Sequence, residues 1–250
     1  MRITGPLESA ALLTVLPVPR RWAVSGSGVL PWAPLVGLVL GGIATGIAVV
    51  GDRWISPLAG AVLGVAVLAL LTRGLHLDGL ADTADGLGPL RSRERALQVM
   101  RQGDVGPFGV GTLVLTLLVQ ISCLAALLET RWGWLAFWCA VVVARIAMAR
   151  TGLPGVVTAE GSSLGALVAG TVSAAWLTGC GLVLLALLIA ATGEPEPAVR
   201  LAASAAGGVL AAELLHRRAR TRLGGVTGDV MGAMGETATA ATLLVAAVAF

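Results

Sequence analysis

Residues 76–86 read His76-Leu77-Asp78-Gly79-Leu80-Ala81-Asp82-Thr83-Ala84-Asp85-Gly86 and stand between two strongly apolar segments. Asp78, Asp82 and Asp85 follow one another at i, i+4 and i+7, so on a helix they fall within roughly 60° of one another. Three like charges on one face repel unless something positive neutralises them. A hard divalent cation, which prefers oxygen ligands, is the first candidate. The alternative is a solvated acidic loop between two spans, but such a loop does not need its acids on one face.

The composition of the chain indicates a membrane protein. Hydrophobic residues make up 56% of its 250 residues and charged residues only 12%, against about 25% charged in a typical soluble domain. We therefore expect an all-α, polytopic helical bundle of about seven transmembrane helices, forming one integral-membrane domain over residues 1–250. The net charge of +3 does not imply a nucleic-acid partner, because Arg clusters at span ends and Tyr is absent.

The apolar runs predict where the chain crosses the membrane. Residues 1–21 are expected to form a short interfacial or re-entrant helix that ends at Pro17 and Pro19. The run Leu164–Thr192 would be about 43 Å long as one helix, so it must tilt, kink near Gly179 or Gly181, or project. The seven predicted spans are Pro34–Val50, Pro57–Thr72, Phe108–Leu128, Trp132–Ala149, Leu164–Thr192, Val199–Leu215 and Ala238–Phe250, the last of which can begin as early as Met231. Short turns are predicted at Asp52–Trp54 and Glu194–Pro197, and polar segments at 73–107, 150–163 and 216–236.

The distribution of Arg predicts the orientation of these spans. With the N-terminus in the cytoplasm, fourteen of the 17 basic residues face inward and three face outward, which is a strong positive-inside signal. The acidic residues that are candidates for catalysis or metal binding then share the inner face, where cytosolic substrates can reach them. The inward set is Arg2, Arg20, Arg21, Arg73, Arg91, Arg93, Arg95, Arg101, Arg145, Arg150, Arg217, Arg218, Arg220 and Arg222, and the outward set is Arg53, Arg131 and Arg200.

Other polar segments carry weaker signals. Residues 91–102 indicate an amphipathic helix on the inner surface, whose Arg residues meet either phosphates or lipid headgroups. Ser162 or Ser163, after Glu160, can cap the next helix or line a ligand site. The Gly-rich run 224–228 followed by Asp229 offers backbone N–H groups, including that of Gly228, for phosphate and a carboxylate for metal. His76 is open to three interpretations: a base, a phosphate contact or an interfacial polar residue.

Residues 76–86 resemble the signature of the cobalamin synthase family, the adenosylcobinamide-GDP ribazoletransferases. Supporting similarity lies in Leu16–Pro19, Pro34–Gly37, Met100-Arg101 with Gly106–Gly109, Ala144-Arg145, Glu160-Gly161 and Thr227–Asp229 with Gly232-Ala233. Where many members carry an acid after Met-Arg, this chain has Gln102, and Asp104 is the nearest acid.

The resemblance implies a Mg²⁺-dependent enzyme of the cytoplasmic (inner) membrane. Such enzymes join adenosylcobinamide-GDP to α-ribazole or its 5′-phosphate and release GMP in a late step of cobalamin biosynthesis. The implied substrates are therefore the partners, together with the lipid membrane. A homo-oligomer, or contact with neighbouring enzymes of the cobalamin pathway, is left open.

Roles follow for individual residues. The expected metal ligands are Asp78, Asp82, Asp85, Asp229, Glu236 and Asp104; the expected catalytic residues are Asp82, Asp85 and His76; and the expected substrate-binding residues are Arg73, Arg145, Glu160, Arg222 and Gly228. The alternatives are a CDP-alcohol-type phosphotransferase, whose second Asp pair is not found, an intramembrane prenyltransferase matching Asp82-x-x-Asp85, and a small transporter, which would place charges near the midplane.

Overall fold

The computed structural model describes residues 4–19 and 26–250, and this part of the chain is helical, as the composition predicts. Arg2, Arg20 and Arg21, which were counted in the charge distribution, lie outside the described residues. The elements are α1 (Gly5–Leu13), α2 (Val29–Trp54), α3 (Pro57–Leu71), α4 (Leu75–Leu87), α5 (Arg93–Met100), α6 (Pro107–Leu128), α7 (Gly133–Ala149), η2 (Arg150–Gly152), α8 (Ser163–Val168), α9 (Ala174–Thr192), α10 (Pro195–Leu223) and α11 (Gly228–Ala249).

Six of the described helices, α2, α6, α7, α9, α10 and α11, are long and apolar enough to cross a membrane. The pair α3 and α4 passes the same test together but is bent by 89°, which gives six or seven crossings in total. With only 13 residues, α4 is too short to cross a bilayer of roughly 30 Å by itself. We therefore treat α3 as the seventh crossing and α4 as a helix that folds away from it at the membrane edge.

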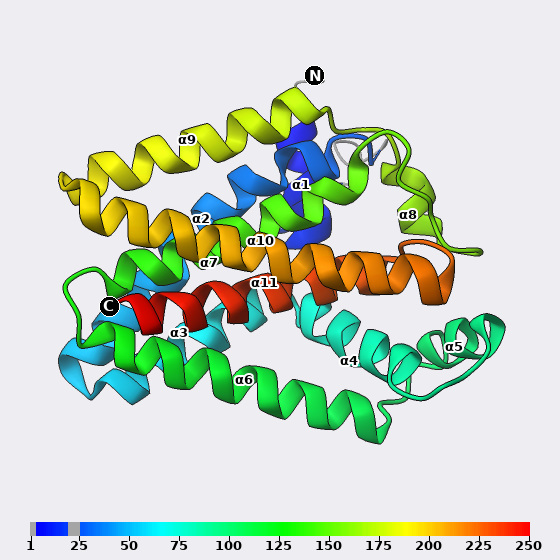
Figure 1. Ribbon diagram of the computed structural model, residues 1–250, viewed down its shortest axis with the longest axis horizontal. Coiled ribbons are helices and arrows are strands. Elements are labelled where there is room, and N and C mark those ends of the chain that lie inside the picture. Colours follow the sequence, from blue (N-terminus) through cyan, green and yellow to red (C-terminus); the bar gives the residue numbers. More distant parts are fainter. Residues whose placement is uncertain (1–3, 20–25) are drawn as a thin grey trace.

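The long helices lie side by side along the long axis of the molecule (Figure 1). At one end are the connections between α2 and α3, α6 and α7, and α9 and α10, together with the C-terminus. At the other end, here named the polar end, are α4, α5, α8 and the connection between α10 and α11. The polar segments predicted to share one membrane face therefore share one end of the bundle.

Two successive left-handed residues separate α3 from α4. Arg73 has φ 55° and Gly74 has φ 66°, and this reversal allows the acidic helix to leave the direction of the span. The Arg73 guanidinium donates a 2.9 Å hydrogen bond to the Leu12 carbonyl at the end of α1. The first helix therefore ends at Leu13, before the two prolines predicted to stop it, and packs beside the bend.

The centre of the bundle is formed by α7 and α11. In their most apolar windows, 83% of the α7 residues and 67% of the α11 residues are buried, against 17% for α6 and 11% for α9. Helices α6 and α9 therefore present most of their apolar surface to lipid. Small residues allow close packing at the centre: a Cβ at Gly37 of α2 would lie 3.2 Å from Arg145 Cβ of α7.

Some predicted boundaries are wrong. The first span is longer than Pro34–Val50, and the predicted turn at Asp52–Trp54 is the last turn of α2, which ends at its C-cap Ile55. The run Leu164–Thr192 is interrupted between α8 and α9 rather than kinked at a glycine within α9. Gly170 with φ +70° allows that break, and Ser173 caps α9 by accepting a hydrogen bond from Trp176 N–H.

Helices α10 and α11 differ most from prediction. The turn before α10 is shorter than predicted, because Pro195 fits the first helical position. The 29 residues of α10 give a length of about 43 Å, so its Arg-rich end projects beyond a hydrocarbon core of roughly 30 Å. Arg has a high helix propensity, so the helix continues through the Arg-rich segment although the apolar span has already ended. Thr227 caps α11 by accepting from Val230 N–H, so this helix begins at Gly228, well before Ala238.

Candidate active site

The acidic helix α4 lies directly against the first turn of α11. A Cβ at Gly79 would lie 2.7 Å from the Asp229 carbonyl oxygen, so only glycine permits this approach. One turn away, a Cβ at Gly232 would lie 3.1 Å from the Cα of His76. These contacts bring Asp229 to the acidic helix from 150 residues further along the chain (229 minus 79).

Aspartates gather where α4 and α11 meet. Asp82 is only 9% exposed, Asp229 is half-buried and Asp78 is exposed. The ion pairs formed by described residues all lie elsewhere, so these acids have no basic partner. Burial raises the pKa of Asp82 to about 7, and the neighbouring carboxylates add to the shift: Asp78, Asp229, Asp85 and Asp104.

Asp85 has a different environment from the other aspartates. Its Oδ2 accepts a 2.7 Å hydrogen bond from Gly106 N–H, and its Oδ1 accepts a 3.0 Å bond from Gly109 N–H. Both donors are free backbone groups at the N-terminus of α6, where a negative charge is favoured. The side chain of Asp85 thus caps the N-terminus of α6, and both of its carboxylate oxygens are occupied by backbone hydrogen bonds.

The donor set can be compared with what Mg²⁺ requires. Among residues 4–19 and 26–250, no three His, Cys, Asp or Glu side chains converge closely enough to hold a metal ion as they stand. Mg²⁺ is usually held by one or two carboxylates together with substrate phosphates and water. Asp78, Asp82 and Asp229 offer such carboxylates without a counter-ion and therefore fit. Asp104 lies on the exposed segment between α5 and α6.

A second polar cluster is enclosed between α4, α6, α7 and α11. Arg145 is 1% exposed, and its Nη2 lies 3.4 Å from His76 Nδ1. Glu236 Oε2 accepts a 2.8 Å hydrogen bond from Gln120 Nε2, and its charge acts on the Arg145 guanidinium. Glu236 lies seven residues after Asp229, about 10 Å further along α11. Arg145 and Glu236, predicted to contact substrate and metal, are thus both enclosed in the interior, within electrostatic reach of each other.

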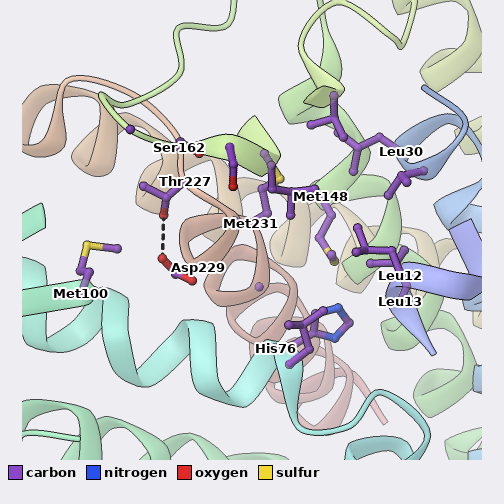
Figure 2. A pocket seen from close by; sticks show the side chains of 18 of the residues that line it. Leu12, Leu13, Leu30, His76, Met100, Met148, Ser162, Thr227, Asp229 and Met231 are labelled. Carbon is purple, nitrogen blue, oxygen red and sulfur yellow. Dashed lines mark hydrogen bonds between the residues drawn. The ribbon is translucent and has the colours of Figure 1, made fainter. Parts of the chain in front are cut away.

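A cavity of about 250 Å³ opens beside these groups. Figure 2 shows Ser162, Thr227 and Asp229 toward one end of it and Leu12, Leu13 and Leu30 at the other, with His76 at the α4 side. Thr227 Oγ1 donates a 3.3 Å hydrogen bond to Asp229 Oδ2. The cavity therefore has a polar end, next to the aspartates, and an apolar end.

The remaining predicted substrate contacts are dispersed. Gly228 lines the cavity, as do His76 and Asp229. Arg73 is engaged with α1 as described above, and Arg222 donates to the carbonyls of Pro89 and Arg91 at 3.3 Å. The Glu160 carbonyl accepts a 2.5 Å hydrogen bond from Arg101, and Glu160 is an exposed residue that is not part of the lining of this cavity.

Some residues at the site were not predicted as site residues. Arg101, at the end of α5, and Thr227 both line the polar end of the cavity, and Gln120 holds Glu236. The first two fall within segments quoted for the family resemblance, which was the available signal. Gln120 stands inside an apolar span, where an isolated amide is itself a sign of a buried partner.

Comparison with known proteins identifies the family of the chain. The sequence profile of the family described as cobalamin-5-phosphate synthase matches residues 6–247. The chain belongs to this family. The matched part of the chain includes α4 and all but the last two residues of α11, so both halves of the candidate site fall within it. The resemblance drawn from residues 76–86 is thereby confirmed.

Relatives named adenosylcobinamide-GDP ribazoletransferase are similar over most of their length. The protein from Frankia casuarinae is 40% identical, over 94% of this chain and 91% of its own. The protein from Chlorobaculum tepidum is 35% identical, over 98% and 95%, and that from Corynebacterium efficiens is 36% identical, over 88% and 82%. No solved structure matches the chain.

Proposed function

We propose that the chain is an adenosylcobinamide-GDP ribazoletransferase that acts where α4 meets α11. It transfers the adenosylcobinamide-phosphate group of adenosylcobinamide-GDP to α-ribazole or its 5′-phosphate and releases GMP, a late step of cobalamin biosynthesis. The observation that carries the proposal is the family match over residues 6–247, which contains both elements of the aspartate cluster.

The reaction exchanges one phosphorus–oxygen bond for another. A ribose hydroxyl oxygen of the acceptor forms a bond to the phosphorus that carries the cobinamide side chain. The bond from that phosphorus to the bridging oxygen breaks, its electron pair leaves with GMP, and the hydroxyl proton is lost. Such transfers depend mainly on positioning the reactants in line and on neutralising charge.

The charge of the cluster supports a metal requirement. The pyrophosphate of the donor substrate is anionic, and Asp78, Asp82 and Asp229 would repel it. Mg²⁺, when bound, would supply the positive charge that allows the two to approach. One or two of the carboxylates of Asp78, Asp82 and Asp229 would hold it together with substrate phosphate and water, and Thr227 donates a hydrogen bond to Asp229 Oδ2.

The position of the site follows from the topology. The chain is an integral membrane protein with multiple spans. In this proposal residues 1–250 act as one domain of the cytoplasmic membrane, because α4 and α11 from the two halves of the chain build one site. The Arg distribution supports a polar end that faces the cytoplasm, where nucleotide substrates are available.

The test is release of GMP by the purified protein in lipid nanodiscs. The reaction receives adenosylcobinamide-GDP with α-ribazole or α-ribazole 5′-phosphate, with and without Mg²⁺. Asp82→Asn removes a charge from the cluster, and Asp52→Asn makes the same chemical change near the opposite end of the bundle. We expect release that needs both substrates, Mg²⁺ and Asp82, and that survives Asp52→Asn.

Absence of GMP release from the folded wild-type protein, with Mg²⁺ and either acceptor, would refute the proposal. Undiminished GMP release by Asp82→Asn would support the activity but show that the aspartate cluster does not carry it.

A further inference from the structure

The cavity beside α4 and α11 is small and largely apolar. Its volume of about 250 Å³ lies below the roughly 300–1,000 Å³ that is typical of sites enclosing a whole drug-sized ligand. Its apolar end is formed by leucines of α1 and α2 and by two methionines, Met148 and Met231, whose sulfurs make favourable contacts with aromatic rings. The cavity therefore fits one flat apolar group of moderate size, as part of a larger ligand whose remainder lies outside.

One polar atom of the apolar end has no partner. His76 is 2% exposed, it lines the cavity, and its Nε2 makes no hydrogen bond with any described residue. Figure 2 shows the imidazole ring on the α4 side of the cavity, below Met148. Leaving a buried polar atom unsatisfied is costly, so this atom points to a ligand.

The contact with Arg145 determines what His76 can offer that ligand. A guanidinium can only donate hydrogen bonds, so the Nδ1 atom that lies 3.4 Å from Arg145 Nη2 acts as an acceptor and carries no proton. The imidazole proton is then on Nε2. The charge of Glu236, which Gln120 holds by a hydrogen bond, acts on the same buried guanidinium, and the contact with Arg145 Nη2 favours this tautomer. Beside the apolar part of the cavity, His76 Nε2–H is thus a buried N–H donor without a partner among the described residues.

The two substrates of the proposed reaction differ in how well they match this donor. The base of α-ribazole is a dimethylbenzimidazole: a flat, apolar bicycle with one nitrogen bound to ribose and one nitrogen free to accept. A corrin macrocycle is several times larger than the cavity. Guanine would bring several donors that the leucine and methionine wall cannot satisfy.

We propose that this cavity is the acceptor subsite, which holds the dimethylbenzimidazole of α-ribazole while His76 Nε2–H donates to its free ring nitrogen. The inference rests on the proposed function and goes beyond it by assigning the subsite. With the base at the apolar end, the ribose lies toward Thr227 and Asp229, so its hydroxyl faces the aspartate cluster. His76 is then a binding residue for the acceptor, and Arg145 is a positioning residue that sets the tautomer.

The sharpest test changes one atom of the ligand. GMP release is measured with α-ribazole and with the same ribonucleoside in which the free ring nitrogen is replaced by CH, a dimethylindole. Loss of a hydrogen bond to a buried donor costs about tenfold to a hundredfold in binding. We expect the KM of wild-type protein for the indole analogue to be higher by about this factor, with the KM for adenosylcobinamide-GDP unchanged.

The protein-side arm compares the two histidines. In His76→Phe the KM values for the two acceptors become equal, because no donor remains to distinguish them. In His216→Phe, which changes a buried histidine of α10 outside the cavity lining, the discrimination is retained. Free 5,6-dimethylbenzimidazole should inhibit competitively against α-ribazole and not against adenosylcobinamide-GDP.

Equal KM values for both acceptors in the wild-type protein, with GMP released, would overturn the subsite and leave the transferase standing. Competition of the free base with adenosylcobinamide-GDP alone would overturn it as well and would favour a guanine site. Because the indole comparison uses unaltered protein, it holds even if His76→Phe fails to fold. No GMP release with any acceptor would instead refute the proposed function.

Discussion

Asp82 and Asp85 lie three residues apart on the same helix, yet their surroundings differ in kind. Both oxygens of Asp85 accept backbone hydrogen bonds at the N-terminus of α6. Asp82 makes no side-chain hydrogen bond to any described residue and faces other carboxylates. An acidic motif that looks uniform in sequence thus combines a carboxylate that holds a helix with one that is free for a ligand. The variants below are designed to break or sharpen this contrast.

The largest effect is expected for Asp82→Asn. It removes a charge that the proposed Mg²⁺ site needs, so GMP release should fall about 10³-fold, which corresponds to roughly 4 kcal/mol. Thermal unfolding followed in nanodiscs should be unchanged or shifted upward, because a like-charge repulsion is also removed. A variant that loses activity together with several degrees of stability would contradict the contrast with Asp85.

The reverse pattern is expected for Asp85→Asn. An amide can accept from only one of the two N–H groups at the start of α6, so about 1–3 kcal/mol of folding stability should be lost. The unfolding temperature checks this, with Asp82→Asn as the matched control for the same chemical change. Activity per folded molecule should fall far less than in Asp82→Asn. Full stability with abolished turnover would place Asp85 among the reacting groups.

The pKa of Asp82 gives the third prediction. A carboxyl with a pKa of about 7 is mostly protonated at pH 6 and mostly ionised at pH 8. Protons and metal compete for it, so affinity for a divalent cation should rise about tenfold from pH 6 to pH 8. Mn²⁺ binding measured by electron paramagnetic resonance without nucleotide tests this. The dependence should disappear in Asp82→Asn, and a flat profile in the wild-type protein would contradict the assignment.

The smallest effect is expected for Arg101, whose guanidinium lies at the polar end of the cavity and donates to the Glu160 carbonyl. An exposed charge contact is worth roughly 1 kcal/mol, so Arg101→Ala should raise the KM for α-ribazole 5′-phosphate about fivefold and leave that for α-ribazole unchanged. Arg95→Ala, on the same helix but paired with Gln98, is the control. This prediction assumes that Arg101 meets the 5′-phosphate of the acceptor, and equal effects on both acceptors would contradict that.

The helices could be largely predicted from the sequence, because hydropathy determines where a chain crosses a membrane. The exceptions have local causes: the Arg-rich end of α10 continues a helix that hydropathy alone ends at Leu215. The site was predictable as a set of acids, and Asp229 does meet α4. What each acid does depends on neighbours far away in sequence, such as Gly106 for Asp85 and Gln120 for Glu236. No periodicity within 76–86 contains that information.

The packing of Gly79 against Asp229 also means that the site depends on the order in which its two helices are synthesised. The ribosome makes α4 long before α11, and every other described helix precedes α11 as well. Until α11 enters the bilayer, Asp82 has no Asp229 beside it and the His76 cavity lacks one wall. The acidic motif is therefore synthesised long before the element that completes the site around it.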